Sequence, residues 1–342
     1  MAFRLSFFYA AVFLTIGVMM PFWPVWLKSR GLDAGEIGLV LATAMWLRAF
    51  TSPLLAQYAD RRGRPDRLAL LLGWSALAVN CLFFFADGFW AILAVSILST
   101  MCFSTLMPLG DAVTMLKVRE QALDYGRVRL WGSIAFIVAA TGSGYVLEGK
   151  PPSSILWLIV GSLGLVVIGC HAIPRAATPG SSSFLAPLTA LLHERRVIAF
   201  MIAASLVQAS HAVYYGFATL HWQASGISAG AIGGLWAEGV ICEVVLFAFS
   251  GRVVARFGPV ALLAFGAGAG VLRWLVLGAT TELWVLVAVQ GLHAFTFGAT
   301  HLAAMHYIAR NVPAQFAATA QSLYSSFFGG TIMALAMLSS GW

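Results

Sequence analysis

The 342 residues are 60% hydrophobic and only 10% charged, and their mean hydropathy is +0.88. Soluble domains carry about a quarter charged residues, so this chain has too little charge to coat a surface that faces water. The formal net charge of +7 is compatible with a nucleic-acid partner, but the placement of the basic residues described below explains it without one. We therefore expect the chain to lie in a lipid bilayer and to bind no nucleic acid.

Long apolar segments follow one another along the chain, and about 20 mostly apolar residues are enough to cross a bilayer. In chain order the predicted spans are 5–27, 36–58, 68–86, 89–116, 128–147, 154–173, 197–220, 229–250, 259–280, 283–309 and 315–340. The first span is not a cleaved signal peptide, because it is too long, lacks a small-x-small cleavage site and leads straight into the second span. The sequence thus predicts an all-α transmembrane protein with eleven spans.

Lysine and arginine collect in cytoplasmic loops, so their positions give the direction of the spans. With the N-terminus in the cytoplasm, fifteen of the 20 basic residues lie in cytoplasmic segments. Lys28, Arg30 and Lys150 lie in outer loops, and Arg48 and Arg273 lie inside spans. We therefore predict an integral multi-pass protein of the plasma membrane, the inner membrane in a bacterium, with a cytoplasmic N-terminus.

A segment near the start of the chain returns 195 positions later without gaps. Residues 31–42, GLDAGEIGLVLA, are echoed by residues 226–237, GISAGAIGGLWA, and Gly63 returns as Gly258. Solenoid repeats are about 20–50 residues long, so a repeat at this distance means that half of the molecule is duplicated. In a membrane chain, duplicated halves predict a transporter whose site lies at the seam between them.

The longest polar stretch, residues 174–196, is rich in Pro, Gly and Ser and is typical of a linker. It divides the chain into an N-terminal six-helix bundle, residues 1–173, and a C-terminal bundle with five spans, residues 197–342. The duplicated half predicts a twelfth span after residue 340. Its absence indicates either a partial or truncated sequence or a family member that has lost its last helix.

These features resemble the major facilitator superfamily, whose members have six spans, a cytoplasmic linker and a repeated half. The loop after the second span, residues 60–64, reads DRRGR and is similar to the superfamily's D-R-x-G-R loop. The resemblance implies a conformational latch that involves Asp60, Arg61, Gly63 and Arg64, because the charges can hold helix ends together in one state. The alternative is a positively charged cytoplasmic loop with no further role.

Three further motifs resemble the phenylpropionic-acid permease group, which is similar to lactose permease and nucleoside:proton symporters. They are PFWPVWL at 21–27, YGRVRLWGS at 125–133 and LHAFTFG at 292–298. The resemblance implies the major facilitator fold of two six-helix bundles, here without the last helix of the second. It also implies alternating access and proton-coupled symport of a small organic solute such as an aromatic monocarboxylate, with a sugar or a nucleoside as the alternatives.

Two charged side chains, Asp111 in the fourth span and Arg129 in the fifth, lie at similar depth in the cytoplasmic half. Each ionisable group inside a span costs about 2.5–3.5 kcal/mol, so such groups are expected to pair or to line a wet cavity. The two could form an ion pair, and the resemblance to lactose permease implies that both bind the substrate. The alternative is a static pair that joins two helices.

Arg48 lies near the middle of the second span, and its equivalent 195 positions later is Glu243 in the eighth. The two charges could meet across a central cavity, or each could face its own half. A buried arginine such as Arg48 is a suitable partner for a substrate carboxylate. Trp23, Trp26 and Trp131 are candidate cavity walls for a ring-bearing solute, although aromatic belts at the membrane interface explain such residues equally well.

Glu243 is also the leading candidate for a proton carrier. Arg273 and His293 fall where lactose permease has an arginine and a histidine, but that permease's carboxylate three residues further on is Thr296 here. A carboxylate next to Arg273 or His293 could gain and lose a proton as its exposure alternates. His301 lies about 80° around the helix from His293 and could share its face. A histidine that is only hydrogen-bonded inside the bundle is the alternative.

Other functional classes find no support in the sequence. No nucleophile–base pair or metal-ligand spacing is present, so we predict no enzyme, no catalytic residues, no metal and no cofactor. No Walker A motif is present, which argues against ATP as the driving force. The expected partners are a small-molecule substrate, protons and lipid, and the expected state is a monomer. A non-transporting sensor or scaffold of the same fold is the rival interpretation.

Overall fold

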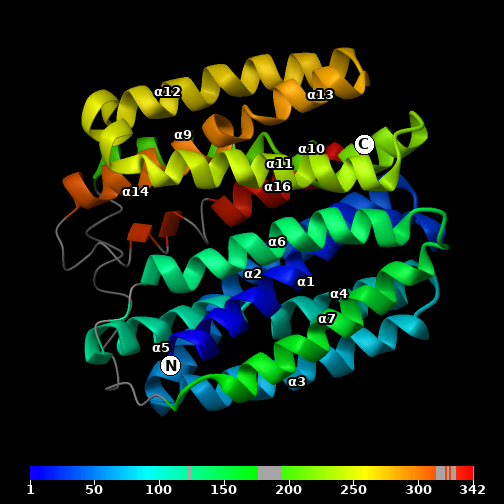
Figure 1. Cartoon of the computed structure of the whole chain (residues 1–342), viewed down its shortest axis with the longest axis horizontal. Helices are drawn as coiled ribbons and strands as arrows, with labels where there is room; N and C mark the ends of the chain where they lie inside the picture. The colour runs from blue at the N-terminus through cyan, green and yellow to red at the C-terminus, as the bar shows by residue number, and fades with distance from the viewer. Residues whose placement is uncertain are drawn as a thin grey trace.

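The computed structural model describes residues 1–121, 123, 125–175, 194–312, 320–321, 323–324 and 329–341. The main elements in this part of the chain are α-helices, which confirms the predicted all-α fold class (Figure 1). They are α1 (Ala2–Ser29), α2 (Ala34–Arg62), α3 (Pro65–Cys81), α4 (Gly88–Phe103), α5 (Leu106–Gln121), α6 (Tyr125–Leu147), α7 (Ser153–Ala172), α9 (Arg195–Ala209), α10 (Ala212–Ala224), α11 (Ala229–Ala248), α12 (Ser250–Ala279), α13 (Leu283–Gln290), α14 (Thr300–Asn311) and α16 (Gly330–Ser340). A π-helical turn, η2 (Ala294–Ala299), lies between α13 and α14.

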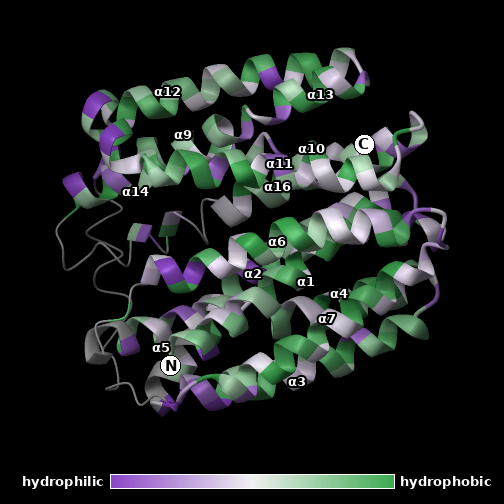
Figure 2. Cartoon of the chain, in the orientation of Figure 1, coloured by the Kyte–Doolittle hydropathy of each residue, from purple (hydrophilic) through white to green (hydrophobic). Residues whose placement is uncertain are grey.

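Nine helical segments in the described part of the chain are long and apolar enough to cross a membrane. Three of them join consecutive helices, namely α4 with α5, α9 with α10 and α13 with α14. Figure 2 shows hydrophobic residues along the helices and hydrophilic residues gathered towards helix ends and loops. The two other predicted spans correspond to α2 and to residues 315–340, of which α16 is the longest described part. The total of eleven spans therefore stays a prediction.

The helices form two groups, seen in the lower and upper halves of Figure 1. In the first group, α1 packs against α6 and α7, and its buried side chains form one continuous core with those of α3 to α7. In the second group, a separate core joins α9, α12 and α14. Residues 176–193 of the predicted linker lie outside the described residues. The domain boundaries at 173 and 197 therefore stay a prediction.

The duplicated segments adopt the same local structure in both groups. Gly31 and Gly226 follow α1 and α10 with φ values of 84° and 83°, a left-handed conformation that glycine adopts without strain. Two residues later, Asp33 and Ser228 accept hydrogen bonds from backbone N–H groups in the first turns of α2 and α11. Each copy is therefore a turn followed by a capped helix. Both turns, residues 30–33 and 225–228, lie at one end of the molecule, here named the repeat end, on the right in Figure 1.

The second copy of the repeat packs against the first group of helices. Gly233 of α11 approaches α6 so closely that a Cβ atom would lie 2.2 Å from the Ala140 carbonyl oxygen. Gly144 of α6 has the same relation to α11, because its Cβ would lie 2.4 Å from the Ala229 carbonyl oxygen. The two backbones thus touch, as small residues allow in membrane helix pairs. We name this contact the α6–α11 seam.

The first copy of the repeat makes a matching contact with the second group of helices. A Cβ atom on Gly38 of α2 would lie 3.2 Å from the carbonyl oxygen of Met337 in α16. Gly341, just after α16, would place a Cβ atom 2.5 Å from the Ala34 carbonyl oxygen. This α2–α16 seam also lies towards the repeat end. The duplicated glycines therefore join the two groups at two places near the same end of the molecule.

Candidate substrate site

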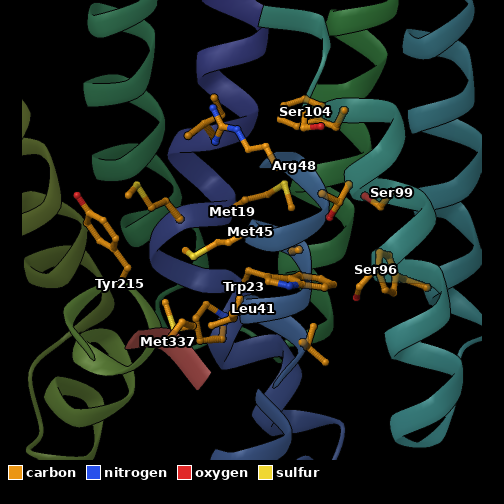
Figure 3. Close-up of a pocket in the computed structure, with 18 of the residues that line it drawn as sticks. Met19, Trp23, Leu41, Met45, Arg48, Ser96, Ser99, Ser104, Tyr215 and Met337 are labelled. Atoms are coloured by element: carbon orange, nitrogen blue, oxygen red, sulfur yellow. The ribbon is translucent and has the colours of Figure 1, made fainter. Parts of the chain in front are cut away.

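A cavity of about 310 Å³ lies between α1, α2 and α4 (Figure 3). It also reaches the second group of helices, because Tyr215 of α10 and Met337 of α16 contribute to its lining. The cavity therefore lies where the two groups meet, which is where carriers built from duplicated halves hold their cargo. Its lining is largely apolar with a few polar groups, as is usual for sites that bind small organic molecules.

Arg48 of α2 is the one charged residue among the described residues that line this cavity. Its side chain is exposed, and within the described part of the chain it makes no hydrogen bond or ion pair. In particular, no ion pair joins it to Glu243, so the two charges do not meet across the cavity. A cation without a partner inside a membrane protein is expensive. Arg48 is therefore ready to receive an anion.

Hydroxyl side chains on α4 and at its end form a polar strip on one wall of the cavity. They belong to Ser96, Ser99, Thr100 and Ser104, whose spacing places them on one side of the helix. The hydroxyl oxygens of Ser96 and Ser104 are buried and lack a hydrogen-bond partner among the described residues, whereas Ser99 accepts from Asn80 at 2.9 Å. An unpaired buried hydroxyl costs about 1–3 kcal/mol. The strip is thus suited to complete the hydrogen bonds of a polar ligand.

Trp23 of α1 forms the aromatic wall of the cavity. Its ring is stacked on that of Trp26, with centroids 4.7 Å apart, and it meets the Phe83 ring edge-on at 4.8 Å. Trp26 therefore supports Trp23 and does not itself line the cavity. Trp131 is 54% exposed on α6 and lies outside the lining as well. Of the three predicted tryptophans, Trp23 is the one placed to contact a ring in this cavity.

The expected ion pair between Asp111 and Arg129 is not formed among the described residues, and neither residue lines the cavity. Asp111 Oδ1 instead accepts hydrogen bonds from the hydroxyl groups of Tyr9 at 2.5 Å and Tyr125 at 3.0 Å. The Arg129 guanidinium lies 4.0 Å from the centroid of the Phe13 ring. Two phenols thus satisfy the carboxylate, while the arginine is held by aromatic faces.

Asp111→Leu is expected to lower the free energy of unfolding by about 1–3 kcal/mol, because the Tyr125 hydroxyl loses its acceptor and the Tyr9 hydroxyl keeps only Thr114 Oγ1 at 3.2 Å. Asp111→Asn is the matched variant, since its amide oxygen can still accept from both phenols. Thermal unfolding of the purified variants measures the change in stability. Calorimetry measures substrate binding by Asp111→Asn, in which the fold should be unchanged. Lost binding in Asp111→Asn with an unchanged unfolding temperature would support the substrate-binding role inferred from the sequence.

Arg273 of α12 is fully buried and tightly held in the second group of helices. Its Nη1 lies 3.1 Å from His293 Nδ1 and 3.1 Å from Thr296 Oγ1. Its Nη2 donates to Gln290 Oε1 at 2.7 Å, and the guanidinium lies over the Tyr214 ring at 4.7 Å. Thr296 therefore serves as a neutral partner of this arginine.

Glu243 of α11 continues this network on the other side of His293. The two side chains approach at 3.7 Å between Glu243 Oε2 and His293 Nε2. His301 is joined more loosely, because it stacks on Phe297, which in turn stacks on His293 with centroids 5.3 Å apart. The π-helical turn η2 lies in the middle of this row, and such turns are frequent at functional sites. The structure thus brings together Glu243, His293 and Arg273.

His211 is a member of this network that was not predicted from the sequence. It is fully buried at the break between α9 and α10. Its Nε2 lies 3.0 Å from Thr296 Oγ1, and its Nδ1 lies 3.0 Å from the Gln208 carbonyl oxygen. A histidine inside the predicted span 197–220 is the signal that could have identified it. Gln290 was also missed, because a neutral amide in a span does not stand out as a charge does.

The loop after α2 is described only in part. The side chains of Asp60 and Arg61 lie outside the described residues. Gly63 has a φ of 64°, and Arg64 donates to both oxygens of Asp66 at 3.1 and 2.9 Å. These hydrogen bonds raise the pKa of the Arg64 guanidinium. They are local to the start of α3, so the latch role stays a prediction.

Known proteins resemble this chain over nearly its whole length. The model of a family described as "MFS_1 like family" matches residues 2–342. A protein of Escherichia coli (strain K12) described as a probable 3-phenylpropionic acid transporter is 36% identical over 98% of this chain and 89% of its own. A maltose permease of Geobacillus stearothermophilus is 25% identical over 94% of this chain and 82% of its own. The solved structure of the nucleoside transporter NupG matches with a TM-score of 0.87 at 16% identity, covering 99% of this chain and 90% of its own.

Proposed function

The chain belongs to the MFS_1-like family and is an integral multi-pass membrane transporter, and on this basis we propose that it carries an aromatic monocarboxylate together with a proton. The relative that is 36% identical is described as a probable transporter of 3-phenylpropionic acid. That molecule combines one ring, a short chain and one carboxylate. The cavity offers one complementary partner for the ring and one for the carboxylate.

The Arg48 guanidinium in the cavity, which has no partner among the described residues, is the observation that carries this proposal. A guanidinium binds a carboxylate through two parallel hydrogen bonds, which are stronger than neutral ones. The hydroxyl groups of Ser96 and Ser104 lack partners among the described residues and supply further donors. Trp23 offers its ring face to the aromatic end. A sugar or a nucleoside has no negative charge for Arg48 to neutralise, which favours the carboxylate.

Uptake into membrane vesicles with an imposed pH gradient tests the proposal. We expect radiolabelled 3-phenylpropionate to accumulate, and we expect maltose and uridine to be neither accumulated nor competitive. Accumulation of a sugar or a nucleoside with no uptake of the acid would support one of the alternative substrates. Uptake of none of these solutes under any gradient would favour the sensor or scaffold.

Proton coupling is assigned to Glu243 in this proposal. Its carboxylate approaches His293 at 3.7 Å, and His293 contacts the buried Arg273. Movement of the two groups of helices would change the exposure of Glu243, and with it the balance between the protonated and ionised forms. Glu243 would thus take up a proton on one side of the membrane and release it on the other.

Glu243→Gln is expected to abolish accumulation driven by a pH gradient while exchange of labelled for unlabelled substrate continues, because the amide cannot carry a proton. Glu238→Gln is the matched control, since Glu238 lies on the same helix and makes no hydrogen bond or ion pair with another described residue. Vesicle uptake and counterflow measure the two activities. Normal proton-driven accumulation in Glu243→Gln would remove this residue from the mechanism.

The proposal also includes the orientation of the chain in the membrane and its oligomeric state. The excess of basic residues in alternate loops supports a cytoplasmic N-terminus in the plasma membrane, the inner membrane in a bacterium. The repeat end would then face the outside. We further propose that the chain works as a monomer, with residues 174–196 as a cytoplasmic linker between the two bundles. Labelling of Lys150 by an impermeant amine reagent from outside the cell tests the orientation.

A further inference from the structure

We propose that five methionines around the cavity form an adaptable wall, so that the transporter selects its substrate by the carboxylate and accepts rings of different size. This inference rests on the proposed function, because it concerns how the same cavity contacts the ring of the substrate. It goes beyond that function because it predicts which feature of the acid is selected and which feature is free to vary. Specificity would lie in the charge, and permissiveness in the side chains that surround the ring.

Methionines are concentrated at this cavity. Five of the 11 methionines of the chain line it, and they come from both groups of helices. They are Met19 and Met20 of α1, Met45 of α2, Met107 of α5 and Met337 of α16, and Figure 3 labels three of them together with Trp23 and Arg48. A wall built from four helices does not depend on the shape of any one of them.

The chemistry of methionine suits contact with rings of different outline. Its side chain is unbranched with three rotatable bonds, so it fills irregular space, and its sulfur makes favourable contacts with aromatic rings. Leucine or isoleucine in the same place would present a fixed branched surface. Arg48 and the hydroxyl strip differ from the methionines, because they provide directional hydrogen bonds. One part of the lining thus demands a particular group, while the methionines adapt to what surrounds it.

The five methionines differ in their freedom to move. Met337 is fully buried, its sulfur accepts a hydrogen bond from Ser340 at 3.6 Å, and a Cβ atom on Gly216 would lie 2.9 Å from that sulfur. Met337 is therefore a fixed part of the wall. Met19 and Met45 are only half-buried and can change rotamer within the cavity. They are the positions at which the proposal is tested.

The test compares competition by acids of different ring size in the intact protein. Unlabelled furylpropionate, with a smaller ring, and naphthylpropionate, with a larger one, compete with labelled 3-phenylpropionate for uptake, and phenylpropionamide serves as the uncharged analogue. The variants are Met19→Ile and Met45→Ile, singly and combined, because a β-branched side chain is restricted in a helix. Met115→Ile is the matched control, since Met115 is exposed and lies outside the cavity lining. Quenching of tryptophan fluorescence gives a second measure of binding that does not require transport.

We expect the unmodified protein to bind both competing acids and to ignore the amide. Each isoleucine variant should weaken the binding of naphthylpropionate, relative to that of phenylpropionate, by roughly 2- to 10-fold, which corresponds to one lost sulfur–aromatic contact. Met115→Ile should leave both affinities unchanged. The inference would be overturned if the protein bound acids of one ring size alone, or if the isoleucine variants bound acids of every ring size as well as the unmodified protein does. In either case, uptake of phenylpropionate would still uphold the proposed function. Failure to transport any carboxylate would overturn both.

Discussion

Arg48→Ala is expected to weaken binding of 3-phenylpropionate by roughly 100-fold, because a charge-assisted bidentate pair contributes about 3 kcal/mol. The free energy of unfolding should stay the same or rise. A structural arginine behaves in the opposite way, since its loss breaks hydrogen bonds that hold the fold. Arg48 makes none with the described residues, and removing an unpaired cation from a membrane interior relieves an electrostatic cost.

Calorimetric binding and thermal unfolding of the same purified variants separate these two outcomes. Arg48→Lys is the conservative control, since it keeps the charge but loses the planar fork, and we expect intermediate affinity. Arg48→Gln should bind the neutral amide analogue at least as well as the acid. A variant Arg48→Ala that binds the acid normally, or one that unfolds at a clearly lower temperature, would contradict the assignment of Arg48 as the carboxylate partner.

Gly233→Leu is expected to reduce uptake roughly 10- to 100-fold by forcing the α6–α11 seam apart, because overpacking of this kind costs about 1–3 kcal/mol. The added Cβ alone would lie 2.2 Å from the Ala140 carbonyl oxygen, which cannot yield without moving the backbone of α6. The helix itself should stay folded, since leucine is a good helix former. The variant should therefore hold the repeat end open.

The neighbouring Gly234 is a matched control, because a Cβ atom there would meet nothing within 4 Å. Gly234→Leu adds the same side chain to the same helix and should leave uptake intact. Opening is measured by the reaction of Ala44→Cys, a position in the cavity lining, with an impermeant thiol reagent. The background for this measurement replaces the four native cysteines. Equal uptake and equal labelling in the two leucine variants would show that the seam does not need to close.

The fold was predictable because its determinants are local. Hydropathy along 20 or so residues identifies a span whatever surrounds it, and the repeated turn with Gly31 and Gly226 shows its structure in a few residues. The way in which the repeated segments pack was not predictable from the sequence. Sequence alone does not reveal that Gly233 contacts Ala140 and that the two copies cross to opposite groups.

The residues of the site were predictable only where the residue type alone is unusual for its position, as a charge is inside an apolar span. Arg48 and Glu243 stand out as charges in apolar spans, and the structure gives both a distinctive setting. The expected ion pair of Asp111 with Arg129 is absent because Tyr9, 102 positions away, competes for the carboxylate. The hydroxyls of Ser96 and Ser104, which lack partners in the described part of the chain, were not anticipated, since serine is common in apolar helices and its partners depend on distant segments.

The two glycine seams have a consequence for the speed and reversibility of transport. Backbone contacts of glycine immobilise no rotamers, so they form without the side-chain entropy that a gate of long side chains would lose. The α6–α11 seam has one charged contact beside them, because the Gly230 N–H donates to a Glu148 carboxylate oxygen at 3.0 Å. The equilibrium between closed and open forms can therefore be shifted by the modest energy of one bound acid and one proton.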